Sequence, residues 1–527
     1  MATLAPLSRP LLLLLSVALL VGVANVGSGW LDPLHTLPQT RFTEGQFINL
    51  ALGARELPFP RHTDLLGAPR GAGFAPLLWP MLWVARVVGP VLALNLCFTL
   101  LPVFNAVSGW VLGRALGLQD WASAALGGLL CWNAWVMNTL ANGQLEQVPI
   151  GGAALLWAAV HVAQRDGRAR LLLPGVVTLA VGLGAPNVAL AGLIGVAMQA
   201  VVALWRGPRA RAVIWLVGVG AAGLLVNAYQ APQFSGGAHV FAPRGTFVTH
   251  QSAAMVPGIF DAATLGALLL PPALPSIASG GVVHCAYLGW VGLVAALGAG
   301  KPGRFWVGIA AVLVIFALGD QVRIGSVIVP LPAALLGMVS SAVAQSGNQY
   351  RLVLGAVAAL SVAAAWTVRG PRSAVLLVGL AWIELALVRN RGVPLPNEPW
   401  VPHASSVALR GGEGTVLDLP LANPQCPEMA WHDAVQAVWT ERPIPLVLAF
   451  DYRAWGTAVD MGRKLERAFT LTDCVDTVPS RLTRLGIRAV VVHHDQTCPL
   501  HPQVVPCLEA LYGPPQRGPE SDWWVLP

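Results

Sequence analysis

The order of apolar and polar positions divides the chain into two parts. Up to about residue 388, long apolar runs alternate with short polar connectors, and beyond that point the apolar runs become short. A helix that spans a bilayer needs about 20 mainly apolar residues. The first part therefore predicts eleven spanning helices, near residues 10–29, 88–113, 121–141, 145–163, 171–186, 187–205, 212–230, 284–300, 305–319, 350–367 and 374–388.

Two further apolar stretches carry prolines that argue against a regular span. In "SVIVPLPAALLGMVSSAVAQ" (326–345) two prolines interrupt the first half. An extra span here would also place every later connector on the opposite side of the membrane. We interpret it as a re-entrant or surface-lying segment on the outer side. The stretch at 260–279 is similar, with Pro271, Pro272 and Pro275.

The N-terminal run "RPLLLLLSVALLVGVANVGSGW" has two interpretations. A basic start, an apolar run and small residues are typical of a cleaved signal peptide. The many spans that follow favour an uncleaved first helix. With either interpretation, residues 30–73 form a loop outside the cytoplasm.

The chain changes character after residue 388. Residues 389–403 form a polar, proline-rich linker, and residues 404–527 alternate strand-like and helix-like patterns. "GTVLDLP", "IRAVVVHH" and "DWWVLP" predict strands, whereas "EMAWHDAVQAVWTE", "DMGRKLERAF" and "VVPCLEALYG" predict helices. The expected fold is an all-α polytopic membrane domain (1–388) followed by a small exported α/β domain.

Composition and charge support this organisation. The chain is 55% hydrophobic and 11% charged, with a mean hydropathy of +0.63, whereas soluble chains carry roughly 25% charged residues. The net charge of +7 comes from short arginine clusters between apolar runs, which argues against nucleic-acid binding. Basic connectors lie on the cytoplasmic side. The clusters at 113–120, 164–170, 205–211, 300–304 and 368–372 therefore predict a cytoplasmic N-terminus and an exported C-terminal domain.

Four cysteines, Cys426, Cys474, Cys498 and Cys507, fall in the exported domain. An even number in an exported domain predicts two disulfides, with three possible pairings. Of these we favour Cys498–Cys507 with Cys426–Cys474.

Charged residues concentrate in the first outer loop, in "RFTEGQFINLALGARELPFPRHTDLLGAPRG" (41–71). Glu44 can act as a general base at the membrane face, or it is an ordinary first-turn helix acid after a Thr43 cap. Asp64 can orient an acceptor or bind a metal, or it hydrogen-bonds its own turn amides. The flanking charges either face a phosphate or are solvated, and they are Arg61, His62 and Arg70.

Other candidates lie near the outer ends of predicted spans. Glu146, in "NGQLEQVP", is an ionisable residue at membrane depth or marks a helix start beside Pro149. Arg351, in "SGNQYR", can bind a lipid phosphate or snorkel to the interface. Arg244 and His250, in the outer loop 231–283, share this ambiguity.

Motifs for cofactors are weak or absent. "HHDQTCPLH" (493–501) contains possible zinc ligands, but its spacing matches no strong metal motif. The sequence has no Walker loop, no G-x-S-x-G and no dinucleotide fingerprint. We assign no metal site and leave a divalent cation open.

The order of several motifs resembles a known superfamily. They are "FPRHTDLLGAPRG" (59–71), "GPVLALNL" (89–96), "NGQLEQVPIGGAALL" (142–156), "FALGDQVRIGSVIVPLPAALL" (316–336), "SGNQYRLVLGAVAALSV" (346–362), "VLDLPL" (416–421) and "RLTRLGIRAVVVHH" (481–494). The layout is similar to GT-C-type membrane glycosyltransferases, and more closely to their uncharacterised bacterial multi-span relatives. The chain departs from the family pattern at two places. "TEGQF" offers one acid where many such enzymes have two, and "SGNQYR" stands where the closer group usually has an aromatic or arginine-rich sequence of the "R-x-P-x-R" type.

The resemblance implies a multi-pass glycosyltransferase of a bacterial inner membrane. It would transfer a sugar from a polyprenyl-phosphate donor to a glycan, lipid or protein acceptor, and it would contact membrane lipid. Glu44 would be the general base, and Arg351 or Arg244 would lie near the phosphate. Two alternatives stay open. One is a flippase or transporter for lipid-linked glycans, for which Glu384 is the clearest charge inside a span. The other is a non-catalytic relative whose exported domain binds a partner.

Overall fold

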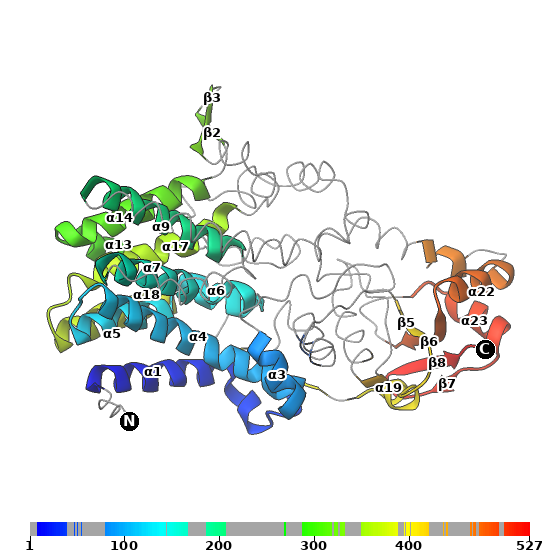
Figure 1. The fold of residues 1–527 in the computed structure, drawn as a ribbon. Coiled ribbons are helices and arrows are strands. Elements are labelled where there is room, and N and C mark those ends of the chain that lie inside the picture. The colour runs from blue at the N-terminus through cyan, green and yellow to red at the C-terminus, as the bar shows by residue number, and fades with distance from the viewer. Residues whose placement is uncertain are drawn as a thin grey trace.

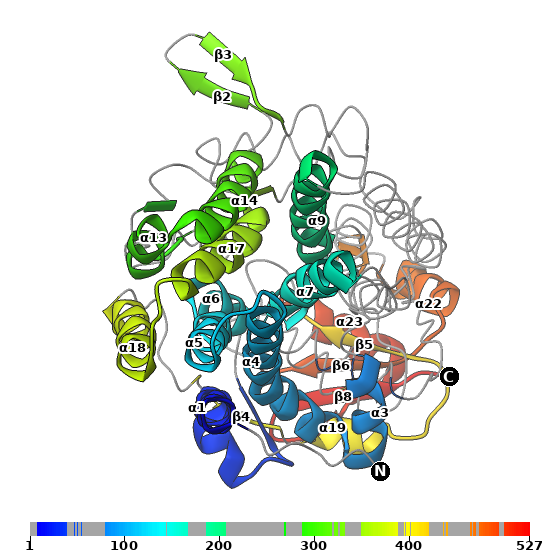
Figure 2. The same ribbon diagram turned by 60° about the vertical axis from the view of Figure 1, so that its left-hand side comes forward.

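The computed structural model of the chain contains a bundle of helices and a small sheet domain, which lie at the left and right of Figure 1. Figure 2 shows the same arrangement turned by 60°. The structure describes residues 8–38, 47, 50, 54, 79–143, 145–166, 186–206, 268–269, 287–318, 321–324, 327–332, 349–387, 395, 397–400, 402–420, 436, 439–440, 464–465, 467–470, 474–494 and 500–527.

Most of the described chain is helical. The helices of the bundle are α1 (Arg9–Val26), α3 (Trp79–Val88), α4 (Pro90–Ala115), α5 (Asp120–Cys131), α6 (Ala134–Asn142), α7 (Gly151–Asp166), α9 (Pro186–Arg206), α13 (Trp290–Leu297), α14 (Lys301–Ala317), α17 (Val353–Ala365) and α18 (Pro371–Leu387). Short 3-10 turns precede or follow some of them: η1 (Gly27–Leu31), η4 (Leu145–Gln147) and η6 (Gln349–Leu352). A proline in the first turn of α1, α4 and α14 fits the helical backbone and needs no N–H partner.

These helices cover most of the predicted spans, with two differences. The stretch at 121–141 is split into α5 and α6 at Asn133, whose side chain accepts a hydrogen bond from Val136 N at 3.0 Å. Of the stretch at 284–300, the structure describes residues 287–300, and within these the helix runs from Trp290 to Leu297. The predicted spans at 171–186 and 212–230 lie almost wholly outside the described residues.

In the described part of the chain, two helical stretches are long and apolar enough to cross a membrane: Arg9–Leu31 and Pro90–Ala115. Shorter apolar helices are Gly151–Val162, Leu190–Trp205 and Val353–Ala365. The total of eleven spans therefore remains a prediction.

Large apolar side chains are exposed on the outer helices of the bundle. Leu20 is 67% exposed, Val87 83%, Trp205 90% and Leu387 81%. On α18, Val375, Leu376, Leu380 and Ile383 are exposed as well. Apolar patches of this extent mark interaction with a partner or a membrane. The surface thus agrees with the membrane placement that the composition predicts.

Basic residues gather at one end of this bundle. Arg114 pairs with Asp120 across the α4–α5 turn at 2.5 Å. Lys301 and Arg304 begin α14, and Gly303 beside them lies against Trp366 in the α17–α18 turn. That turn also holds Arg369. Gly128 of α5 contacts Val378 of α18, and Ala134, just beyond α5, packs with Leu385 farther along α18. These two helices therefore run in the same direction and begin at the same end. This clustering is the pattern expected of a cytoplasmic face.

The sheet domain has four strands in the order β5–β6–β8–β7: β5 (Thr415–Leu419), β6 (Ile487–His493), β8 (Ser521–Val525) and β7 (Gln516–Arg517). β5 and β6 are parallel, and the other pairs are antiparallel. One sheet face packs on α22 (Cys474–Arg484) and α23 (Val504–Tyr512), and the other on α19 (Ala404–Ala408). The three predicted strands are confirmed, whereas α22 and α19 were not predicted.

A hairpin of β2 (Gln321–Ile324) and β3 (Val327–Pro330) projects from the bundle at the top of Figure 1. It includes the first residues of the proline-containing stretch 326–345. The beginning of that stretch is thus a strand of a two-stranded sheet, while residues 333–345 lie outside the described part.

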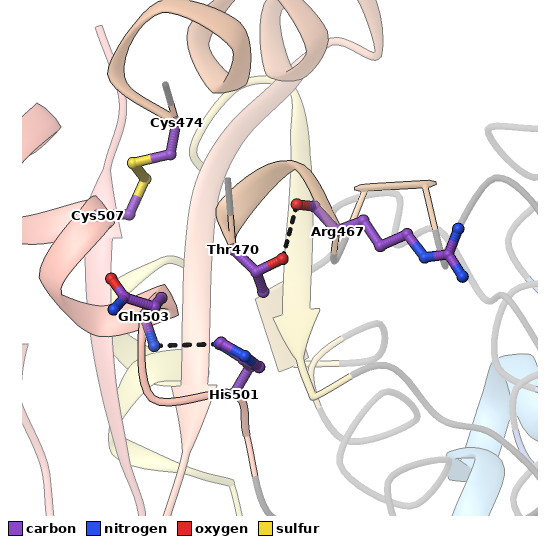
Figure 3. Close-up of a disulfide and its surroundings, with 6 residues drawn as sticks. All are labelled: Arg467, Thr470, Cys474, His501, Gln503 and Cys507. Atoms are coloured by element: carbon purple, nitrogen blue, oxygen red, sulfur yellow. Dashed lines mark hydrogen bonds between the residues drawn. A yellow bond between two sulfur atoms is a disulfide. The ribbon is translucent and has the colours of Figure 1, made fainter. Parts of the chain in front are cut away.

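A disulfide joins Cys474 at the start of α22 to Cys507 in α23 (Figure 3). The pairing of Cys498 with Cys507 and of Cys426 with Cys474 that we favoured is therefore wrong. Two helices that cover the same sheet face bring these cysteines together, and their spacing along the chain carries no sign of this packing. Cys426 and Cys498 lie outside the described residues.

Candidate active site

An irregular segment interrupts the bundle between α6 and α7, and it carries Glu146. The helix α6 ends at Gly143, which has the left-handed φ of 73°. The chain then forms η4 and enters α7. The neighbours of Glu146 are buried, with Leu145 1% and Gln147 2% exposed. Non-helical backbone at membrane depth is tolerated only where protein covers it or where it lines a cavity.

Asn105 holds this segment against the middle of α4. Its side-chain Nδ2 donates to Val148 O at 2.9 Å, and its Oδ1 accepts from Gly151 N at 2.9 Å. Asn105 lies ten residues before the end of α4 at Ala115, which corresponds to roughly 15 Å of helix. The segment beside Glu146 therefore lies opposite the middle of α4, deeper than the span end at which the sequence placed it.

Trp135 of α6 also binds the segment, and further buried polar residues lie in that helix. Trp135 Nε1 donates to Gln147 O at 2.9 Å, and Thr139 Oγ1 donates to Trp135 O at 2.8 Å. Asn138 is 9% exposed. The side-chain Oε1 of Gln147 is buried and has no hydrogen-bond partner among the described residues. Such a group favours a polar neighbour or ligand, because an unpaired buried oxygen is costly.

Arg351 lies in η6 and is half-buried. The turn η6 directly precedes α17, as the Glu146 segment precedes α7. The helices α7, α9 and α17 pack side by side and run in the same direction. Trp157 of α7 donates to Gly192 O of α9 at 3.0 Å, and Gly355 of α17 lies directly against Ala191. The structure therefore brings the segments of Glu146 and Arg351 to the starts of neighbouring helices.

The segment that follows α1 begins the loop that the sequence predicts to lie outside the cytoplasm, and we call it the first outer segment. It is bound to α4. Asn95 Nδ2 donates to Pro33 O at 3.1 Å and to Thr36 O at 2.9 Å. Farther along, Phe47, Leu50 and Ala54 are helical and buried in the apolar core of the bundle. The predicted site residues of the two outer loops lie outside the described residues: Glu44, Arg61, His62, Asp64, Arg70, Arg244 and His250.

The sheet domain contains a separate buried polar cluster. His493 Nε2 and Asp418 Oδ1 are 3.2 Å apart, with side chains 1% and 0% exposed. The ring of His403 meets that of His493 edge-on at 5.5 Å. On the same sheet face, Ser521 Oγ donates to Ser405 Oγ at 3.0 Å. This polar cluster links α19 to the carboxyl end of β6.

The histidines of "HHDQTCPLH" point to different partners. His493 faces Asp418, whereas its neighbour His494 contacts Asp522 at 3.4 Å. His501 Nδ1 accepts from Gln503 N at 3.3 Å, beside the disulfide (Figure 3). Among the described side chains, no group of three His, Cys, Asp or Glu residues is arranged to hold a metal ion.

Glu384 caps a helix inside the bundle. Its Oε1 accepts from the Tyr287 hydroxyl and from Trp290 N at 2.6 Å, and its Oε2 accepts from Val291 N at 3.0 Å. These amides are the exposed N–H groups of α13, which a carboxylate stabilises. The charge in this span thus has a structural role.

Sequence reasoning missed Asn95, Asn105 and Asp418. Asparagine within the apolar run "PVLALNLCFTLLPVFNAVSGW" was the available signal, because polar groups inside spans are costly and have specific partners. Asp418 follows three buried β5 residues and belongs to the motif "VLDLPL", but its histidine partner comes from β6, which is distant in the sequence.

No protein-family model and no curated protein matches the sequence. Among solved structures, the chain is similar to the apo oligosaccharyltransferase of Archaeoglobus fulgidus, with 12% identity and a TM-score of 0.47, over 92% of this chain and 69% of that one. It is also similar to the arabinofuranosyltransferase AftD from Mycobacteria, with 14% identity and a TM-score of 0.49, over 99% of this chain and 42% of that one. Both of these solved structures are named as enzymes that transfer sugars.

Proposed function

We propose that the chain is a membrane glycosyltransferase, which moves a sugar from a polyprenyl-phosphate donor to an acceptor on the outer face of a bacterial inner membrane. The observation that carries the proposal is that three polar segments lie together in the bundle, away from the end that carries its basic residues. The first outer segment is bound by Asn95, and the segments of Glu146 and Arg351 begin α7 and α17. The opposite end carries Arg114, Lys301 and Arg369.

In this proposal, the acceptor hydroxyl attacks the anomeric carbon of the sugar. A C–O bond forms to the acceptor, the bond to the phosphate oxygen breaks, and the phosphate leaves with the electron pair. Glu44 takes the hydroxyl proton as general base. Arg351 or Arg244 stabilises the charge on the leaving phosphate, since guanidinium groups bind phosphate through paired hydrogen bonds. Glu146 lies in the buried segment near Gln147 and contacts the donor or the acceptor.

The transporter alternative relied on a charge within a span. Glu384 binds the Tyr287 hydroxyl and two amides of α13. Since this carboxylate has a structural role, we propose no second function.

The test compares wild type with Glu44→Gln, Glu146→Gln and Arg351→Ala in membranes at matched expression. Transfer of labelled sugar from a panel of polyprenyl-phosphate donors to endogenous acceptors is measured. We expect a loss of about 100-fold or more in Glu44→Gln, in line with removal of a general base. Glu509→Gln, an exposed acid of α23, is the control and retains full transfer. Equal transfer by wild type and Glu44→Gln would move the base elsewhere, first to Asp64.

A further inference from the structure

The segment before the sheet domain is joined to the first outer segment by a two-stranded sheet. β1 (Thr36–Pro38) pairs with β4 (Asn397–Pro399) in antiparallel register, with Leu37 opposite Glu398. Trp400 N donates to His35 O at 2.5 Å. Residues about 360 positions apart in sequence therefore form one element at the end of the bundle.

The same segment also contacts the end of α1. Leu395 N donates to Asn25 O at 3.1 Å, and Asn397 Nδ2 donates to Val26 O at 2.9 Å and to Ser28 Oγ at 3.1 Å. The fit is close, because a Cβ at Gly29 would lie 2.8 Å from Asn397 Oδ1. Since Asn95 of α4 holds Pro33 and Thr36, the strand pair is bound to two helices of the bundle.

Trp400 extends this attachment to the loop itself. Its indole is 2% exposed and lies 4.0 Å from the fully buried ring of Phe47, centroid to centroid. Phe47, Leu50 and Ala54 belong to the same apolar core as Trp400. Phe47 follows Glu44 by only three residues in the sequence.

Little chain separates Trp400 from the sheet domain. The helix α19 begins at Ala404, and its Ser405 is hydrogen-bonded to Ser521 of β8. Trp400 is therefore separated from the sheet domain by only a few residues of chain.

We propose that Trp400 is a positioning residue, through which the sheet domain and the first outer segment act as one unit and hold Glu44 in its productive place. This inference rests on the proposed function for the role of Glu44. The exported domain then controls transfer through its attachment, and an acceptor bound to it is presented at a fixed distance from the loop.

The first experiment does not require activity. A cysteine replaces Glu44, and its reaction rate with a membrane-impermeant maleimide is measured by peptide mass spectrometry in the full-length protein. Trp400→Ala is expected to raise this rate about threefold to tenfold, the factor that corresponds to loss of one aromatic pair. Trp400→Phe keeps the ring contact with Phe47. Its maleimide reaction rate at residue 44 is therefore expected to stay within about twofold of the rate in the protein that retains Trp400.

The matched control is Trp306→Ala. Trp306 is 3% exposed and pairs with Trp157 at 5.3 Å, near the basic end of the bundle. Its removal is expected to leave the rate at residue 44 unchanged. If Trp400→Ala fails to accumulate, Phe47→Leu removes the same ring pair and is expected to give the same increase. Equal rates in the Trp400 (or Phe47) and Trp306 variants would overturn the proposal.

The second experiment measures transfer with the native Glu44. Trp400→Ala is expected to lower kcat about threefold to tenfold with little change in the KM for acceptor, and Trp400→Phe to restore kcat. A change in KM alone would contradict a positioning role. If wild type transfers no sugar from any donor, the proposed function fails, while the labelling result still decides whether Trp400 fixes the loop.

Discussion

Replacement of Asn105 by leucine tests whether one side chain holds the Glu146 segment in the bundle. The asparagine is 0% exposed, and it makes two hydrogen bonds of 2.9 Å, to Val148 O and from Gly151 N. Each bond contributes about 0.6 kcal/mol between transmembrane helices and about 1 kcal/mol in typical proteins. The unpaired amide and carbonyl add a desolvation cost, so we expect Asn105→Leu to lower the free energy of unfolding by about 2 kcal/mol.

The assay is equilibrium unfolding of the purified protein in mixed micelles, together with hydrogen exchange of the peptide that covers residues 145–152. Exchange there is expected to accelerate, because the Gly151 amide loses its acceptor. Thr99→Val on the same helix is the control, since its hydroxyl makes one long bond of 3.4 Å to Gly22 O. Its expected cost is below about 0.6 kcal/mol. Equal destabilisation by both variants, or unchanged exchange at 145–152, would refute this account of Asn105.

Two further predictions concern the other contacts between distant segments. Glu384→Gln retains one acceptor oxygen for three donors, so the free energy of unfolding is expected to fall by about 1.5–3 kcal/mol. Tyr287→Phe removes one of these donors and is expected to lower it less. Thermal unfolding in micelles measures both changes. Cys474→Ser opens a loop of 33 residues and is expected to lower the free energy of unfolding of the sheet domain by about 3–4 kcal/mol, measured by denaturant unfolding. The double variant with Cys507→Ser is expected to cost the same, and a larger loss in the double variant would contradict this pairing.

The helices and central strands were predictable because their signals are local. Long apolar runs identify α1, α4, α9 and α17, and short β-branched runs identify β5 and β6. Where prediction failed, a distant group decides the outcome. The span at 284–300 begins its helix at Trp290 because Glu384, from another helix, supplies the cap. The cysteine pairing failed for the same reason, since packing of α22 beside α23 sets it.

The candidate site follows the same division between local and distant information. Sequence patterns identify Glu146 and Arg351 as ionisable residues near span ends, but they do not identify the groups that hold their segments. Asn105 belongs to α4, and Trp400 belongs to the segment that precedes the sheet domain. A polar residue in an apolar run has to find a partner, although the sequence does not say which one. Asparagines such as Asn95 and Asn105 are therefore the residues whose substitution reports most directly on how the segments that follow α1 and α6 are held in place.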